Sequence, residues 1–191
     1  MARSSPIPKI LLVAATELEL SGNTGLVCGV GPVEAAVATA SQLALEPPRA
    51  VLHVGVAGGR RLTPGAIVLG TEAVYSDLET EMTVVARAEP DATLLAALQL
   101  AFPEAISLPI ATSASVSGPT SSRSHDLRVE GMEGFAVLRA CELAGVPAVE
   151  VRVVSNDIGE GNRALWMMRR GVDVLAETIP RALAALDDLP G

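Results

Sequence analysis

The chain has 191 residues, a length that fits a single domain spanning 1–191, and its 49% apolar residues are enough for a buried core. It carries 14 basic and 22 acidic residues, and the net charge of −8 excludes nucleic acid as an expected partner, because phosphate binding requires clustered lysine and arginine. One Trp, one Tyr and two Phe are too few for a base-stacking platform or for the aromatic belt of a membrane protein.

Neither a membrane segment nor a secretion signal is expected. The apolar stretch at 50–59 is broken by His53 and by glycines, well short of the ~20 apolar residues that span a bilayer. Residues 1–9 are polar and contain proline, without the long apolar region of a signal peptide. We therefore expect a cytoplasmic protein without membrane contact, in which Cys28 and Cys141 are reduced core residues.

Apolar runs and helical patterns alternate along the first part of the chain. Short apolar runs predict buried strands at 10–15, 25–30 and 50–56. From 32 to 45 the apolar residues recur at helical spacing, and Pro47 ends that predicted helix.

Further strands are predicted at 66–75, 82–88 and 108–116. A helix is predicted at 91–101, with Asp91 placed to cap its N-terminus.

The last part of the chain begins with a polar Gly, Pro and Ser segment at 117–124, which predicts a mobile loop of the kind that often carries function. A helix at 132–144, a strand at 148–155 and a helix near 165–186 follow. Apolar strands joined by helices predict the α/β class, as a single-domain three-layer α/β/α structure with a mixed central sheet.

Carboxylates, an amide and glycines follow the predicted strands. Glu17 and Glu19 come after the first strand, a glycine-rich turn at 55–59 after the third, Glu133 before a helix, and Asn156 after the last strand. Ligands of open α/β sheets bind at the carboxyl ends of the strands, so these groups are expected at one edge. Each also has a structural explanation, since a Glu can be a solvated surface residue or complement a helix dipole, and Asn156 can cap a turn.

The remaining polar residues and glycines do not predict a catalytic triad, a metal site or a nucleotide-cofactor site. Arg152 lies in an apolar strand and needs a partner, and an internal salt bridge fits as well as a ligand contact. His53 is expected in the core and His125 in a solvated loop, so neither a Ser-His-Asp triad nor a metal site is predicted. The turn at 55–59 lacks the spacing of a dinucleotide fingerprint or a P-loop, which disfavours NAD and ATP.

Six segments, in this order, resemble the nucleoside phosphorylase/nucleosidase superfamily and within it the futalosine hydrolases, with the methylthioadenosine/S-adenosylhomocysteine nucleosidases as near relatives. The segments are Ala14-Ala15-Thr16-Glu17-Leu18-Glu19, Gly29-Val30-Gly31-Pro32-Val33-Glu34-Ala35-Ala36, Val54-Gly55-Val56-Ala57-Gly58-Gly59, Met132-Glu133-Gly134-Phe135-Ala136-Val137, Gly145-Val146-Pro147 and Val151-Arg152-Val153-Val154-Ser155-Asn156.

The resemblance implies a role for each polar residue. It makes Glu19 the carboxylate that orders the attacking water, and Glu133 the ribose-binding carboxylate, with Met132 beneath the ring. Asn156 stands where adenine-specific relatives have an acidic Asp. An Asn amide suits N7 and the oxygen of a 6-oxopurine, so hydrolysis of futalosine in menaquinone synthesis is the first expectation, although Asp157 could occupy the base site instead.

The resemblance also assigns further substrate contacts, at Ala57, Gly58, Val116, Phe135, Arg152, Ser155 and Trp166. It implies a purine nucleoside as the small-molecule partner, a homodimer or larger assembly, and catalysis without metal or cofactor. Water is favoured over phosphate as the nucleophile, because the carboxylates of Glu17 and Glu19 repel an anion.

Two other functions remain open at this point. The first is an adenine-releasing nucleosidase that acts on methylthioadenosine, S-adenosylhomocysteine or aminodeoxyfutalosine. The second is a protein that binds a nucleoside without converting it. Asn156 in place of an acidic residue is the feature that suggests this function.

Overall fold

The computed structural model describes residues 10–78, 80–115 and 127–189. The predicted loop at 117–124 lies outside these residues, as do Val116 and His125.

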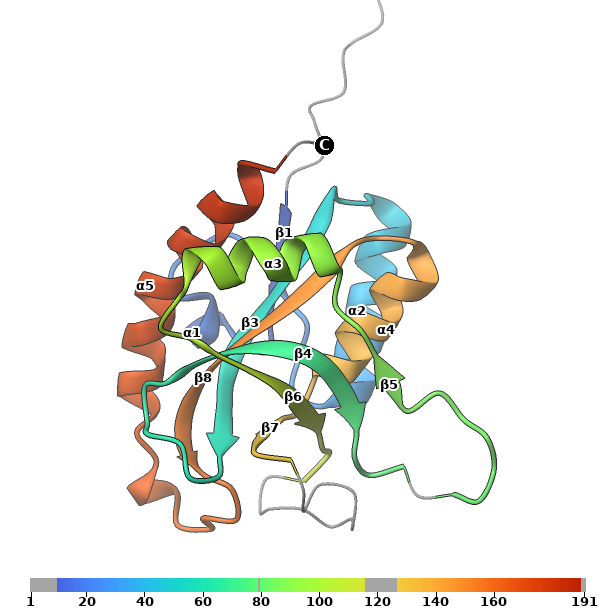
Figure 1. The fold of residues 1–191 in the computed structure, drawn as a ribbon. Helices are drawn as coiled ribbons and strands as arrows, with labels where there is room; N and C mark the ends of the chain where they lie inside the picture. Colours follow the sequence, from blue (N-terminus) through green and yellow to red (C-terminus); the bar gives the residue numbers. More distant parts are fainter. Residues whose placement is uncertain (1–9, 79, 116–126, 190–191) are drawn as a thin grey trace, which may run out of the picture.

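The centre of the fold is an eight-stranded mixed sheet (Figure 1). Its first part is parallel, with β2 (Leu26–Val27), β1 (Ile10–Ala14) and β3 (Ala50–Gly59) side by side and β8 (Ala148–Asp157) on the far side of β3. Beyond β8 the sheet turns antiparallel at β4 (Ile67–Tyr75).

The remaining strands close the sheet on itself. Strand β4 pairs with β5 (Arg87–Ala88) and β6 (Ile106–Thr112), β6 pairs with β7 (Val129–Gly131), and β7 returns to the end of β3. The ring of pairings β3-β8-β4-β6-β7 therefore places β7 and β8 on either side of the carboxyl end of β3.

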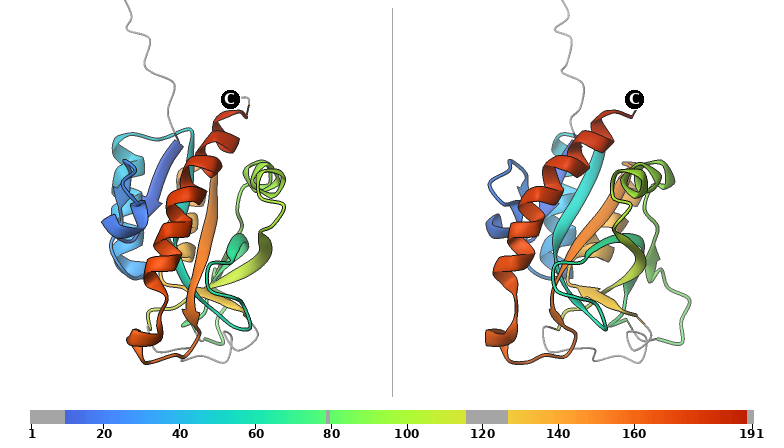
Figure 2. Two further views of the ribbon diagram at one scale, coloured as in Figure 1. Left: turned by 90° about the vertical axis from the view of Figure 1, so that its left-hand side faces the viewer. Right: turned by 60° about the vertical axis from the view of Figure 1, so that its left-hand side comes forward.

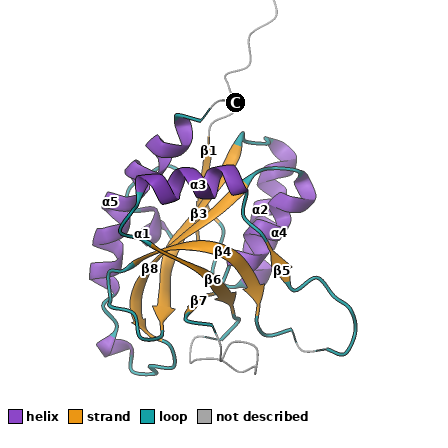
Figure 3. Ribbon diagram, viewed as in Figure 1, coloured by secondary structure: helices purple, strands orange, loops and turns teal. Residues whose placement is uncertain are grey.

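Helices cover both faces of the sheet, which confirms the predicted three-layer α/β/α class (Figures 1 and 3). One side carries α2 (Pro32–Leu45) and α4 (Gly134–Ala144), and the other carries α3 (Ala92–Ala101) and α5 (Met168–Asp187). Figure 2 shows that α5 runs beside β3 and β8, with which it is in contact.

The core has two main parts because successive side chains of a strand point to opposite faces. Leu12 packs with Leu98 and Leu175 toward α3 and α5, whereas Val13 packs with Leu138 and Cys141 toward α2 and α4. Both faces of the central strands are thus buried, as their apolar runs predict. Burial raises the pKa of the Cys28 and Cys141 thiols to about 12, which fits inert core residues.

Several predicted boundaries differ from the structure. The strand predicted at 25–30 is only Leu26–Val27, since Gly29 and Gly31 take positive φ values of 84° and 95° that interrupt an extended strand. The strand predicted at 82–88 contains only Arg87–Ala88, and the apolar side chains of Val84 and Val85 before it are exposed.

The structure confirms one predicted helix start and shifts another. Asp91 caps α3 as predicted, with its Oδ1 accepting from the Thr93 and Leu94 N–H groups at 2.9 and 3.0 Å. The final helix begins later than predicted, at Met168, because 163–165 forms a separate 3₁₀ turn, η2 (Arg163–Leu165). No described helix is both long and apolar enough to cross a membrane.

Candidate active site

A cavity of about 480 Å³ opens at the carboxyl ends of β1, β3 and β8, a volume typical of sites for small molecules. Many of the predicted site residues line it: Glu19, Ala57, Gly58, Met132, Glu133, Ser155, Asn156 and Trp166. The fold therefore gathers groups that lie more than a hundred residues apart in the chain at the sheet edge where they were expected.

Two predicted substrate contacts lie elsewhere. The ring of Phe135 stacks on Tyr75, with centroids 5.3 Å apart, and belongs to the core under α4 rather than to the cavity wall. Arg152 is fully buried behind the wall, where carboxylates surround it. Its predicted ligand contact is replaced by the internal salt bridge that its apolar strand also allowed.

Glu19 is fixed at the cavity wall by the short helix α1 (Glu17–Leu20), which follows β1 directly. The Thr16 hydroxyl caps this helix by accepting from the Glu19 N–H and donates to Glu19 Oε2 at 2.9 Å. The Val56 N–H donates to the other oxygen, Oε1, at 3.0 Å. With a relative exposure of only 6%, the carboxylate has one defined orientation, which is what a general base for an ordered water requires.

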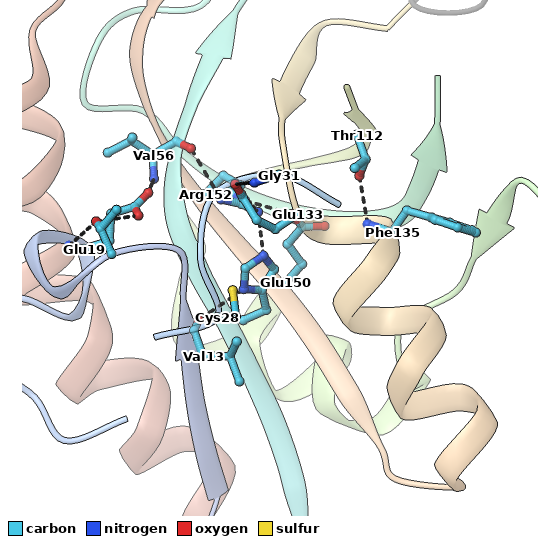
Figure 4. Close-up of polar contacts among 12 residues, drawn as sticks. Val13, Glu19, Cys28, Gly31, Val56, Thr112, Glu133, Phe135, Glu150 and Arg152 are labelled. Carbon is cyan, nitrogen blue, oxygen red and sulfur yellow. Dashed lines mark hydrogen bonds and ion pairs between the residues drawn. The ribbon is translucent and has the colours of Figure 1, made fainter. Parts of the chain in front are cut away.

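Glu133 stands at the start of α4 but makes no capping bond to the helix (Figure 4). Its Oε1 accepts from the Gly31 N–H at 3.1 Å, and its Oε2 lies 3.3 Å from Arg152 Nη2. Thr112 Oγ1 accepts from the Phe135 N–H instead, at 2.8 Å. The carboxylate is thus anchored toward the cavity, and helix-dipole compensation alone does not account for its position.

A buried ion cluster stands behind these two carboxylates. Arg152 Nε donates to Glu150 Oε1 at 2.7 Å, and its Nη2 donates to His53 Nε2 at 2.6 Å. His53 Nδ1 lies 3.1 Å from the Val13 carbonyl oxygen, which only accepts, so the imidazole proton sits on Nδ1. His53 is therefore the satisfied core histidine that the sequence predicted.

Arg152 stays charged and His53 stays neutral in this cluster. Burial alone would lower the pKa of Arg152, but the carboxylates of Glu150, Glu133 and Glu19 outweigh it and raise that pKa. Burial, and then the nearby guanidinium, hold the pKa of His53 well below its usual range. Burial raises the pKa of Glu150, whose Oε2 has no hydrogen-bond partner among the described residues. Arg152 is thus the permanent cation that binds Glu133.

Glycines make room for this cluster. A Cβ at Gly55 would lie 2.2 Å from Arg152 Nη1 and 2.8 Å from Glu19 Oε1, and a Cβ at Gly134 would lie 2.4 Å from both oxygens of Glu150. Side chains at these positions would push the guanidinium and the carboxylates apart.

We expect Gly55→Ala to lower the free energy of unfolding by about 1–3 kcal/mol, because Arg152 and Glu19 must both move. Gly161→Ala is the matched control, since nothing lies within 4 Å of a Cβ there. Urea unfolding of the two variants gives the comparison. Equal behaviour of both variants would contradict the tight packing at Gly55.

Asn156 lies at the end of β8, where it lines the cavity beside Ser155. Its Oδ1 is 2.8 Å from Ser155 Oγ, and its Nδ2 donates to the Asp157 carbonyl oxygen at 3.0 Å. The second N–H of the amide is left to donate to a ligand acceptor. Asp157 does not line the cavity, so of these two residues Asn156 is the one placed to contact a bound molecule.

Two further charged residues line the cavity that sequence reasoning missed: Glu130 on β7 and Arg163 on η2. Strand β7 has three residues and no apolar alternation, so nothing in the sequence predicted it. Arg163 lies three residues before Trp166, a spacing that could have been recognised as one helical face. No group of three metal-ligating side chains occurs in the part of the chain that the structure describes.

Comparison with known proteins identifies the family of the chain. A model of the phosphorylase superfamily matches residues 22–186. The futalosine hydrolase of Streptomyces coelicolor is 31% identical, over 85% of this chain and 79% of that protein. The futalosine hydrolase of Thermus thermophilus is 27% identical, over 87% and 84% of the two chains.

Among solved structures, the methylthioadenosine/S-adenosylhomocysteine nucleosidase of Colwellia psychrerythraea, in complex with adenine, superposes with a TM-score of 0.83 at 21% identity, covering 95% and 96% of the two chains. At that identity the match establishes the fold alone. The chain belongs to the phosphorylase superfamily and, within it, to the family of the futalosine hydrolases.

Proposed function

We propose that this protein hydrolyses the N-glycosidic bond of futalosine and releases hypoxanthine. The observation that carries the proposal is one cavity lined by two anchored carboxylates, Glu19 and Glu133, with Asn156 at its edge. Its sequence relatives are futalosine hydrolases. We further propose a cytoplasmic homo-oligomer that acts in menaquinone synthesis.

Each anchored group has a task in the proposed reaction. Glu19 takes a proton from the water that attacks C1′ of the ribose, and Glu133 accepts hydrogen bonds from the sugar hydroxyls. As the bond to the base breaks, positive charge develops on the sugar, and these two carboxylates stabilise that oxocarbenium-like transition state. Met132 lines the cavity between Gly131 and Glu133, where a sugar can pack on it.

The charges of the cavity favour water over phosphate as the nucleophile. The described lining contains the carboxylates of Glu19 and Glu133, the carboxyl group of Glu130 and one cation, Arg163. A phosphate near Glu19 would meet repulsion that a neutral water does not.

The nature of the base follows from the amide at the end of β8. The free N–H of Asn156 can donate to N7 or to the oxygen of a 6-oxopurine, whereas an adenine-specific site benefits from an acid at this point. Release of adenine is the second candidate function, because the structurally similar nucleosidase binds adenine in the same fold. A nucleoside-binding protein without turnover is the third candidate.

We propose that Arg163 and Trp166 bind an acidic group on the 5′ side of the substrate. The Arg163 guanidinium lies 5.8 Å from the centre of the Trp166 ring, whose Nε1 is tied to the Glu160 carbonyl oxygen at 2.9 Å. Arg163 forms no ion pair with a described carboxylate. An aromatic carboxylate, such as the one futalosine carries and inosine lacks, fits an indole face beside an unpaired guanidinium.

We expect Arg163→Met to raise KM for futalosine about tenfold with kcat little changed, because a charge-assisted hydrogen bond is lost. KM for inosine, if it is turned over, should stay the same. Arg169→Met is the matched control, since Arg169 is exposed nearby and does not line the cavity. An unchanged KM for futalosine would remove Arg163 from substrate recognition.

The test of the function is incubation of the purified protein with futalosine, aminodeoxyfutalosine, methylthioadenosine and inosine, with and without phosphate. Chromatography of the free base gives the readout. Hypoxanthine from futalosine, independent of phosphate, is the expected result. Adenine release would establish the second candidate function, phosphate dependence a phosphorylase, and absence of any release a binding protein.

A further inference from the structure

The proposed hydrolysis leaves one chemical task without a residue. A purine leaves C1′ far more readily when a proton reaches one of its ring nitrogens as the bond breaks. Asn156 meets the base but has no proton that it can release, because an amide is not an acid in the physiological range. If the protein has the proposed function, on which this inference rests, the proton must come from another group.

Glu130 is placed to meet the leaving base from the side opposite Asn156. In the sheet, Gly58 pairs with Glu130 of β7 on one side and with Asn156 of β8 on the other. Two strand spacings separate the backbones of Glu130 and Asn156, a distance of about 10 Å. Both residues line the cavity, and Gly58 between them presents no side chain.

The carboxyl group of Glu130 lacks the partners that the other site carboxylates have. Its Oε2 is buried and accepts no hydrogen bond from any described residue, whereas Glu19 and Glu133 are each held by backbone N–H groups. A buried carboxylate oxygen without a donor is costly in its charged form. This environment therefore favours the protonated carboxyl, which can donate.

The titration of Glu130 agrees with that geometry. Burial, and then the charge of Asp77, raise its pKa to about 7, although Arg60 opposes the shift. A sizeable fraction of Glu130 is therefore protonated at neutral pH, as a general acid requires.

We propose that Glu130 is the general acid of the reaction, donating its carboxyl proton to the purine edge opposite Asn156, where N3 is the acceptor. As the C1′–N9 bond breaks, its electron pair moves into the base, and the Glu130 proton makes the departing hypoxanthine neutral. Water forms the new C1′–O bond and gives its proton to Glu19. The cycle leaves Glu130 ionised and Glu19 protonated, and proton exchange with solvent restores both.

The test is Glu130→Gln, measured with futalosine between pH 5 and 9. The amide has nearly the same shape and can still hydrogen-bond a ring nitrogen, but it has no proton to transfer. We expect kcat to fall about 100-fold with KM within a few-fold of the wild type. The wild-type kcat should decline above pH 7, and this decline should be absent from the variant.

Asp157→Asn is the matched control, because it removes an exposed carboxylate near the same sheet edge that does not line the cavity. Its kcat and its pH profile should match those of the wild type. Hydrolysis by the wild type together with an unchanged kcat and pH profile in Glu130→Gln would overturn this inference while leaving the proposed function intact. Absence of wild-type hydrolysis would instead overturn the proposed function.

Thermal unfolding gives a second measure that does not depend on turnover. Because the folded-state pKa of Glu130 is raised, ionisation of this group removes stability as pH rises through about 7. Glu130→Gln should therefore melt close to the wild type at pH 5 and above it at pH 9. An equal Tm difference at both pH values would show that Glu130 does not titrate in this range, which contradicts the proposal.

Discussion

Replacing Glu19 with Gln is expected to lower kcat for futalosine about 1,000-fold while KM changes little, within the range that loss of a general base produces. The amide oxygen can still accept from the Val56 N–H, so the side chain keeps its place in the cavity wall. What the variant loses is the group that takes a proton from the attacking water. Release of hypoxanthine under single-turnover conditions measures the chemical step directly.

Glu17→Gln is the control for this experiment, because Glu17 is an exposed carboxylate on the same short helix that does not line the cavity. Its kcat should equal that of the wild type. An unchanged kcat in Glu19→Gln would exclude the proposed base. A protein that binds a nucleoside without converting it would show no turnover in any of the three forms.

The position of Glu19 could be predicted from the sequence because the evidence for it is local. An apolar run ends at Ala14–Ala15 and two glutamates follow it closely, so the end of the strand can be seen in the sequence. The same holds for Asn156, which lies at the end of the longest buried strand of the second half. The short helix α1, which Thr16 caps, was not predicted.

The position of Glu130 could not be predicted because it depends on closure of the sheet. Strand β7 contributes three residues, and it is held by β6 on one side and by the end of β3 on the other. Such pairings join segments that are far apart in the chain, and three residues, 129–131, are too few to show a pattern that predicts a strand. Glu130, the proposed general acid, therefore lies in the strand that the sequence pattern did not predict.

Arg152 shows a different limit of sequence reasoning. A charged residue in an apolar strand predicts a buried partner, but not which one. Here the strand alternation places Glu150 and Arg152 on one face, and the sheet brings His53 and Glu133 to the same point. The arginine holds Glu133, the proposed ribose-binding carboxylate, from behind and does not itself line the cavity.

Arg152→Met is therefore expected to lower the free energy of unfolding by about 3–5 kcal/mol, because Glu133 and Glu150 lose their buried counter-ion. Turnover of futalosine should fall as well, since Glu133 is no longer held at the sugar site. Urea unfolding and base release are the two measurements. Arg139→Met is the control, because its ion pair with Glu142 is partly exposed and is worth at most about 1 kcal/mol.

The double variant Glu150→Gln/Arg152→Met separates the structural role of Arg152 from its role at the site. Removing the buried Glu150 charge should restore part of the lost stability, because less uncompensated charge remains in the core. Activity should not return, since Glu133 still lacks the guanidinium at 3.3 Å that positions it. Recovery of both stability and turnover would mean that Arg152 serves only to neutralise Glu150, and that Glu133 is positioned by the Gly31 N–H alone.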